Sequence, residues 1–174
     1  SFSDGGRFNR NNFGYKHGIN LINSGCDILD IGGESTRPGS ETISSIKEWK
    51  RIEQTLTRIS KKNNISLDTR KSDIMEKGIK LGVNLINDVS GLNFDKNTLK
   101  ILKKYKTPFV LQHSIKNPKT MQNNPSYKNV LLDIYDFFEK NIQGRLKNNN
   151  LIIDPGIGFG KTLKHNLTLI SKIS

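Results

Sequence analysis

The alternation of short apolar runs with amphipathic segments constrains this chain more than any other feature of its sequence. Five runs are rich in Ile, Leu and Val, and most of them are apolar at consecutive positions. Such runs are typical of strands in a parallel sheet that is covered on both faces. The five predicted strands span residues 26–31, 65–67, 84–86 (with 88–89 beyond it), 108–111 and 151–153.

Amphipathic helical patterns lie around these strands, because their apolar residues recur at spacings of three and four. The predicted helices span residues 11–24, 46–62, 71–81, 95–105, 129–146 and 165–173. Strict alternation of strand and helix predicts a parallel α/β fold, in one domain over residues 1–174. The carboxyl ends of parallel strands meet at one edge, where the active sites of such folds form.

Composition excludes several classes of protein. The chain has 174 residues, enough to bury one core, and its single Cys excludes a disulfide framework and a Cys-based zinc site. No apolar run approaches the ~20 residues that a membrane span needs, so no membrane partner is expected. The formal net charge is +12, but the basic residues are scattered and form no run typical of a nucleic-acid patch. Lys, Asn and Ile are abundant and have AT-rich codons, and Ala is absent, so bias of an AT-rich genome is the favoured explanation of the charge. A small anionic substrate could still benefit from it.

Polar side chains follow every predicted strand, and Asp68, Asn87 and Asp154 stand at three strand ends. Taken singly, an Asp here could be the N-cap of the next helix. Taken together, these residues suggest a pocket for a flat ring with adjacent N–H donors. A carboxylate accepts two parallel hydrogen bonds, and an Asn both donates and accepts. A metal site is the competing interpretation of two Asp and one Asn.

The Gly-rich segment 154–162 nearly matches a phosphate-binding P-loop. Residues 160–162 (GKT) fit the end of that motif, but Pro155 occupies the position of its first Gly. Proline has no N–H and a restricted φ, so the segment lacks what a phosphate cradle needs. A turn that only joins a strand to a helix and a substrate loop with Asp154 facing inward are the other interpretations.

Four further residues are weighed singly. Arg37 lies in a Gly-rich segment and is either a phosphate ligand or part of a surface turn. His113 ends a strand and could be a general base, but a structural hydrogen bond to the backbone is favoured. Cys26 is expected to be a small core residue at the start of a buried strand. His165, in a helical pattern, is expected to face solvent.

Six motifs, in this order and spacing, resemble those of the dihydropteroate synthases. They are SFSDGG at 1–6, DIGGESTRPG at 30–39, SLDTRK at 66–71, LINDVSGL at 85–92, NPKTMQ at 117–122 and LIIDPGIGFGKTLKHN at 151–166. The resemblance implies a TIM (β/α)8 barrel that condenses 6-hydroxymethyl-7,8-dihydropterin pyrophosphate with p-aminobenzoate. The implied products are 7,8-dihydropteroate and pyrophosphate, in folate biosynthesis, and the implied inhibitors are sulfonamides.

The resemblance also carries site residues over to matching positions of this chain. Asp68, Asn87 and Asp154 would bind the pterin, with Asp68 and Asp154 as catalytic residues. The residues near p-aminobenzoate and pyrophosphate would be Phe2, Thr36, Arg37, Pro38 and Phe159. Mg²⁺ on the pyrophosphate is implied, with its protein ligand expected before Ser1 and no metal ligand within the chain. A homodimer is implied as well, with a cytoplasmic location or, in a eukaryote, an organellar one.

The chain departs from the family pattern in two ways. Gln112 stands where the family usually has a Met that packs on the pterin. The resemblance also places about strands two to six of the barrel within residues 1–174, and strands one, seven and eight outside. We therefore expect a partial sequence, truncated at both ends. By itself it should be inactive and poorly folded, because an open wedge leaves strand edges unpaired.

Two other functions stay open at this point. A pterin- or methyltetrahydrofolate-binding barrel without synthase activity shares the strand-end Asp and Asn, but would lack the motifs at 1–6 and 32–39. A P-loop-like nucleotide-binding module would depend on Lys161.

Overall fold

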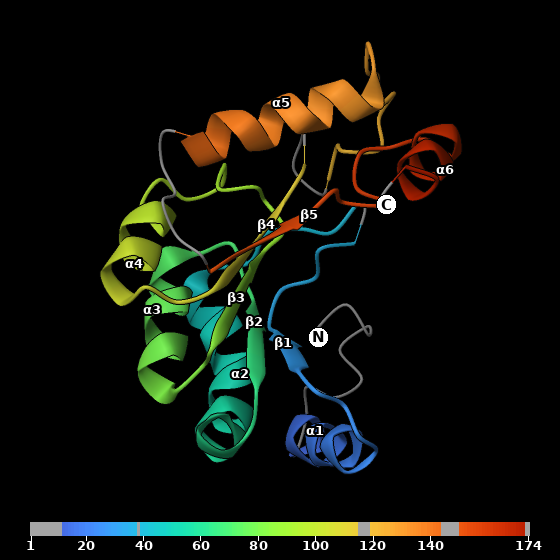
Figure 1. The fold of residues 1–174 in the computed structure, drawn as a ribbon. Helices are drawn as coiled ribbons and strands as arrows, with labels where there is room; N and C mark the ends of the chain where they lie inside the picture. Colours follow the sequence, from blue (N-terminus) through green and yellow to red (C-terminus); the bar gives the residue numbers. More distant parts are fainter. Residues whose placement is uncertain (1–11, 38, 115–118, 144–149, 173–174) are drawn as a thin grey trace.

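The computed structural model describes residues 12–37, 39–114, 119–143 and 150–172. Strands and helices alternate along this part of the chain, as predicted (Figure 1). The strands are β1 (Leu29–Gly32), β2 (Ile65–Asp68), β3 (Leu85–Asp88), β4 (Phe109–Gln112) and β5 (Leu151–Asp154). The helices are α1 (Phe13–Asn23), α2 (Ser45–Ile59), the 3₁₀ turn η2 (Ser60–Lys62), α3 (Ser72–Leu81), α4 (Thr98–Tyr105), α5 (Val130–Gln143) and α6 (Leu163–Ile170).

Each strand pairs in parallel with the next strand along the chain, in the order β1-β2-β3-β4-β5. A doubly wound sheet reverses its strand order at one point, whereas a barrel adds each strand beside the previous one. Helices α2, α3 and α4 lie side by side along one face of the sheet (Figure 1). The described strands therefore form an arc of a parallel α/β barrel.

Local signals place the helix ends. Ser44 caps α2 by accepting a hydrogen bond from the Lys47 N–H, and Gly82, with a φ of 102°, ends α3. Thr162 and His165 form a capping box at the start of α6. His165 therefore faces solvent only in part: it is half-buried, and its Nδ1 accepts the Thr162 N–H.

The first strand is shorter than predicted. It begins at Leu29 rather than at residue 26, because the chain leaves α1 through a turn in which Gly25 has a φ of 92°. The Cys26 N–H in this turn donates to the Leu21 carbonyl, 3.2 Å away. Cys26 therefore packs half-buried against the core from a turn, and not from within a strand.

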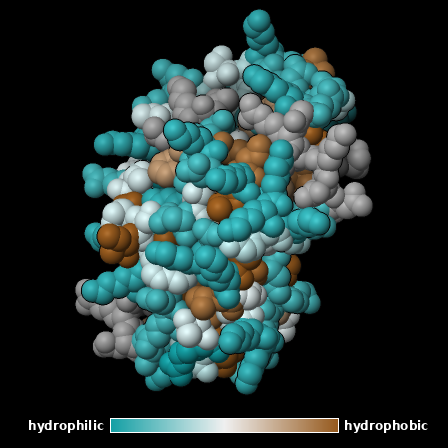
Figure 2. Space-filling view, turned by 90° about the vertical axis from the view of Figure 1, so that its left-hand side faces the viewer, coloured by the Kyte–Doolittle hydropathy of each residue, from teal (hydrophilic) through white to brown (hydrophobic). Residues whose placement is uncertain are grey.

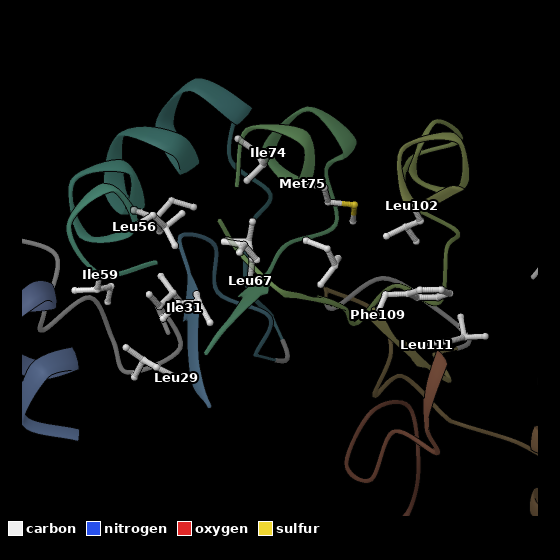
Figure 3. Close-up of a cluster of buried hydrophobic side chains, with 14 of the residues drawn as sticks. Leu29, Ile31, Leu56, Ile59, Leu67, Ile74, Met75, Leu102, Phe109 and Leu111 are labelled. Carbon is white, nitrogen blue, oxygen red and sulfur yellow. The ribbon is translucent and has the colours of Figure 1, made fainter. Parts of the chain in front are cut away.

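The hydrophobic core lies between the sheet and the helices. Leu67 of β2 lies near Ile74 and Met75 of α3, and Phe109 and Leu111 of β4 are buried in the same layer (Figure 3). Burying one such side chain contributes about 1.5–3 kcal/mol. Because side chains of a strand alternate between the two faces, the residues between these apolar ones face away from the helices.

The side of the molecule on which α3 and α4 lie is mainly hydrophilic, with separate hydrophobic patches (Figure 2). Within the described ranges, no helix combines the length and the apolar character that crossing a membrane requires.

Candidate active site

The carboxyl ends of the strands bring polar residues to one face of the sheet. Asp68 is in register with Gly32 on one side and with Asn87 on the other, and Gln112 is in register with Asp154. The residues that precede Asp68, Asn87 and Gln112 are buried in the helix-side core. Alternation therefore turns these polar residues to the opposite face, and Asp154 shares that face through its register with Gln112. The structure thus gathers the three predicted ring-binding residues at one edge.

Asp68 is a buried acid at this edge whose pKa is strongly shifted. Its side chain is 5% exposed, and burial, followed by the nearby Asp30 carboxylate, raises its pKa to about 8. Its carboxyl group occupies the space above Gly32, where an added Cβ would lie 2.9 Å from Asp68 Oδ2. Asp68 Oδ1 is buried and has no hydrogen-bond partner in the described part of the chain. A buried acceptor without a partner is costly, so this oxygen is placed to accept an N–H from a ligand.

Gln112 carries a second buried polar atom of this kind. The residue is 3% exposed, and its Nε2 has no hydrogen-bond partner among the residues that the structure describes. The sequence pointed to Gln112 as a departure from the family pattern, but not to this unpaired donor.

Asp154 shapes the loop that follows β5. Its Oδ1 accepts the Gly156 N–H at 2.7 Å, and its carbonyl accepts the His113 N–H at 2.8 Å. Gly156 has a φ of 70°, and an added Cβ would lie 2.2 Å from the His113 carbonyl oxygen. A residue other than Gly would therefore force the ends of β4 and β5 apart.

Lys161 is buried beneath the same loop, with 4% of its surface exposed. Its ammonium donates to the carbonyls of Gly156 and Phe159, both at 2.9 Å, and lies 3.1 Å from His113 Nδ1. Burial lowers the pKa of Lys161 to about 8. The three donors of an ammonium are thus directed at protein acceptors, and the geometry does not support a P-loop lysine that reaches a phosphate.

His113 has a structural partner in addition to the backbone. Its Nδ1 faces the Lys161 ammonium, and its ring packs edge-on against Phe137, with centroids 4.9 Å apart. Burial, and next the charge of Lys161, lowers the pKa of His113 to about 4. The imidazole is therefore neutral at pH 7 with one nitrogen already engaged, which disfavours a general base.

A buried ion network lies behind the loops that follow β1 and β2. Glu34 accepts from Arg70 at 2.7 Å and from the Lys71 ammonium at 3.0 Å. Lys71 also pairs with Glu48, which accepts the Thr69 hydroxyl at 2.5 Å. All five residues are buried. Sequence reasoning missed the network, because a charged residue on a helix such as α2 is normally solvated.

The same network holds the loop that bears the predicted residues Thr36 and Arg37. Glu34 begins this loop, and its Oε1 also accepts the Ile43 N–H, at 2.8 Å, near the end of the loop. Within the loop, the Ser40 hydroxyl donates to the Ser35 carbonyl at 2.7 Å. Thr36 is buried and Arg37 is exposed, so the loop presents the guanidinium outward.

Comparison with known proteins agrees with this geometry. Residues 1–174 match the family described as pterin binding enzymes. The chain belongs to the pterin-binding enzyme family. A solved dihydropteroate synthase from Yersinia pestis, in a sulfonamide drug complex, is similar with a TM-score of 0.91 and 35% identity, over 99% of this chain and 65% of that one. A Clostridium difficile dihydropteroate synthase, solved in the presence of pteroic acid, gives a TM-score of 0.85 at 35% identity, with the same coverage.

A curated dihydropteroate synthase from Clostridium beijerinckii is 40% identical over 99% of this chain and 64% of its own length. The chain therefore spans less than two thirds of this relative. The match to solved barrels confirms the predicted fold class, an arc of a TIM barrel, for this pterin-binding enzyme.

Two of the predicted loop residues of this pterin-binding enzyme, Phe2 and Pro38, lie outside the described residues. Phe159 is described and half-buried, in the loop that Lys161 holds. Across the described ranges, no three His, Cys, Asp or Glu side chains are grouped so that they could hold a metal ion.

Replacing Lys161 with Met should loosen the loop between β5 and α6 and lower the free energy of unfolding by about 2 kcal/mol. The variant leaves the buried carbonyls of Gly156 and Phe159 without their charged donor. Hydrogen exchange of the loop amides and urea unfolding measure both effects. Lys164→Met, at an exposed position of α6, is the matched control and should change neither. Equal exchange rates in the two variants would contradict this role of Lys161.

Proposed function

We propose that the protein that carries these residues is a dihydropteroate synthase. It would join 6-hydroxymethyl-7,8-dihydropterin pyrophosphate to p-aminobenzoate and release pyrophosphate. The observation that carries the proposal is the buried, unpaired Asp68 oxygen at the carboxyl edge of a pterin-binding barrel, in register with Asn87. The similar proteins named above, with their sulfonamide and pteroic acid complexes, support the same reaction.

Ring binding is the first task that we assign to the strand ends. A pterin edge offers adjacent N–H donors, which suit the carboxylates of Asp68 and Asp154. Asn87 can both donate and accept, so it suits ring nitrogens of alternating character. Asp68 and Asp154 are the catalytic residues of this proposal, because they would touch the ring that carries the developing charge.

The reaction then needs little covalent chemistry from the protein. The C–O bond of the pterin breaks, pyrophosphate leaves with the electron pair, and the positive charge spreads into the ring. The amine of p-aminobenzoate attacks the carbon and loses a proton. The protein holds the ring in position for attack by the amine, excludes water and stabilises the charges that develop. Positioning and electrostatics therefore supply the rate enhancement.

The loops are the second part of the proposed site. The proposed contacts to p-aminobenzoate and pyrophosphate come from Phe2, Thr36, Arg37, Pro38 and Phe159. The exposed guanidinium of Arg37, on the loop held by Glu34, suits a phosphate oxygen. Mg²⁺ stays a prediction. The homodimer, the cytoplasmic location and the single pterin-binding domain over residues 1–174 also stay predictions.

Turnover and binding test the proposal together. The protein should form dihydropteroate from the two substrates, release pyrophosphate, and be inhibited by a sulfonamide in competition with p-aminobenzoate. Asn87→Ala should weaken pterin binding by about tenfold to a hundredfold in calorimetry, because a polar ring then lacks a partner in a desolvated site. The control is Asn23→Ala, at an exposed position of α1, which should leave binding unchanged.

Other outcomes would favour the alternatives. Pterin binding without turnover would indicate a pterin-binding barrel that is not a synthase. ATP binding that Lys161→Ala abolishes would support the nucleotide-binding hypothesis and contradict the proposal.

A further inference from the structure

We propose that Gln112 is a specificity-determining residue of the pterin pocket, whose Nε2 donates a hydrogen bond to an acceptor atom of the bound ring. The acceptor is a ring nitrogen or the ring oxo group. This inference rests on the proposed function, because it assigns a role to a further residue of the same site.

The burial of Gln112 is the first observation that supports it. The side chain is 3% exposed, and its Nε2 is buried with no hydrogen-bond partner among the described residues. Native proteins pair most buried polar groups, so an unpaired donor calls for a physical reason. A ligand that arrives with an acceptor provides one.

The register of β4 gives the direction of the side chain. Phe109 and Leu111 of this strand are buried in the helix-side core, where Figure 3 shows them. Gln112 follows Leu111, so it faces the other side of the sheet, and it is in register with Asp154. The unpaired donor therefore lies on the face that carries the strand-end acids.

Asp68 provides the complementary unpaired atom. It ends β2, and its buried Oδ1 is an acceptor without a partner in the described ranges, whereas Gln112 Nε2 is a donor on β4. One strand, β3, separates them and carries Asn87. Strands β2 and β4 are thus about 10 Å apart, and Gln112 lies two residues beyond Val110, the β4 residue level with Asp68. A fused two-ring ligand that lies obliquely across β3 can reach both side chains. An acceptor at one end and a donor at the other also favour one orientation of the ring.

The unpaired donor implies opposite effects on stability and on binding. In the ligand-free protein, a buried donor without a partner is destabilising, so an apolar side chain of similar shape should be better tolerated. In the complex, the same change removes a hydrogen bond. Gln112→Met should therefore raise the melting temperature of the ligand-free protein and weaken pterin binding. A residue that only fills space would not separate the two effects in this way.

The test compares the wild-type protein with Gln112→Met and Gln112→Glu. Calorimetry with 6-hydroxymethylpterin should show about fivefold to tenfold weaker binding for Gln112→Met, the usual effect of one neutral hydrogen bond. Gln112→Glu keeps the shape but offers only acceptors when ionised, so it should bind at least as weakly as Gln112→Met. The KM for p-aminobenzoate should stay unchanged in Gln112→Met.

Pterin analogues identify the acceptor. In deazapterins, one ring nitrogen is replaced by C–H, and in a 2,4-diaminopteridine the oxo group is replaced by an amine. The difference between wild type and Gln112→Met should vanish for the analogue that lacks the contacted acceptor. If the difference persists with every analogue, Gln112 acts by packing and the inference is overturned.

Each remaining outcome is also decisive. Equal pterin binding by wild type and a folded Gln112→Met overturns the inference and leaves the proposed function intact. Full binding by Gln112→Glu at a pH where the new carboxyl is ionised overturns the donor role. A wild-type protein that binds no pterin overturns both the inference and the proposed function. If Gln112→Met does not fold, the analogue series with wild type and Gln112→Glu decides the question.

Discussion

Replacing Asp68 with Asn is expected to weaken pterin binding by about a hundredfold and to remove most of its pH dependence. A hydrogen bond to a charged group contributes about 1.5–3 kcal/mol, and the upper end of this range corresponds to about a hundredfold in Kd. Asp68 is buried, and its Oδ1 has no hydrogen-bond partner in the described part of the chain, so no described residue competes with the ligand for that oxygen. Calorimetric titration with a pterin measures the loss.

The pH dependence follows from the raised pKa of Asp68. Burial, and then Asp30, raises this pKa to about 8, so the ligand-free carboxyl carries a proton at pH 6. A ring that donates N–H bonds to it favours the ionised form, and binding must then release that proton. Affinity should therefore rise with pH by up to about tenfold per unit below pH 8 and level off above it.

Two measurements check that the affinity for the pterin rises with pH. Titrations in buffers of different ionisation enthalpy should show the release of about one proton on binding at pH 6 to 7. Asp30→Asn is the control: it removes a neighbouring negative charge and should shift the rise in affinity to lower pH without abolishing binding. Titration of the ligand itself persists in Asp68→Asn, so that variant isolates the contribution of the carboxyl. A wild-type affinity that is constant from pH 6 to 9 would contradict the prediction.

The raised pKa of Asp68 also affects the stability of the ligand-free protein. The folded state holds the Asp68 proton over a pH range, from about 4 to about 8, in which the unfolded state has released it. Folded protein then binds more protons, so this residue lowers the free energy of unfolding as the pH rises through that range. Asp68→Asn should remove this contribution and be more stable than wild type at pH 8.

Replacing Glu48 with Ala is expected to lower the free energy of unfolding by about 3–5 kcal/mol, the usual cost of breaking a buried ion pair. Glu48 lies on α2 and is fully buried, where it accepts the Thr69 hydroxyl and pairs with the Lys71 ammonium. Without Glu48, the Lys71 ammonium keeps its ion pair with Glu34 at 3.0 Å. The space that the Glu48 side chain filled is left empty. Urea unfolding measures the difference.

Two variants control this experiment. Glu53→Ala removes an exposed acid from the same helix and should change the free energy of unfolding by no more than about 0.5 kcal/mol. Glu48→Gln keeps the shape and one acceptor, and should cost about 1–3 kcal/mol. A loss below 1 kcal/mol for Glu48→Ala would show that the network contributes little, and the loop anchored by Glu34 would then need another support.

Much of the fold could be predicted because its signals are local. The apolar run at 65–67 indicated β2, and the periodicity of 71–81 indicated α3, which the structure has at Ser72–Leu81. The start of the first strand was wrong because apolar residues alternate with Asp27 and Asp30 throughout 26–31, so the pattern does not separate the turn from the strand that follows it. The candidate ring-binding residues Asp68, Asn87 and Asp154 followed from their places at strand ends.

The rest of the site depends on contacts between distant residues. Lys161 fits the end of a P-loop motif in the sequence. Its ammonium contacts His113, however, which lies 48 positions away in the chain. Lys71 and Glu48 pair in the interior across 23 positions, and no local pattern in the sequence indicates that pairing. The unpaired atoms of Asp68 and Gln112 could not be predicted either, because an unpaired atom is defined by every neighbour that the fold brings near it.

The sequence by itself determined the order of strands and helices, the parallel α/β class and the residues that stand at the strand ends. These depend on short apolar runs and on a periodicity of about 3.6 residues, which are features of neighbouring positions. The tertiary structure alone decided which charges are buried, which donors and acceptors lack partners, and which loop each cation holds. Burial and pairing are properties of the packed chain, and residues far apart in the sequence set them.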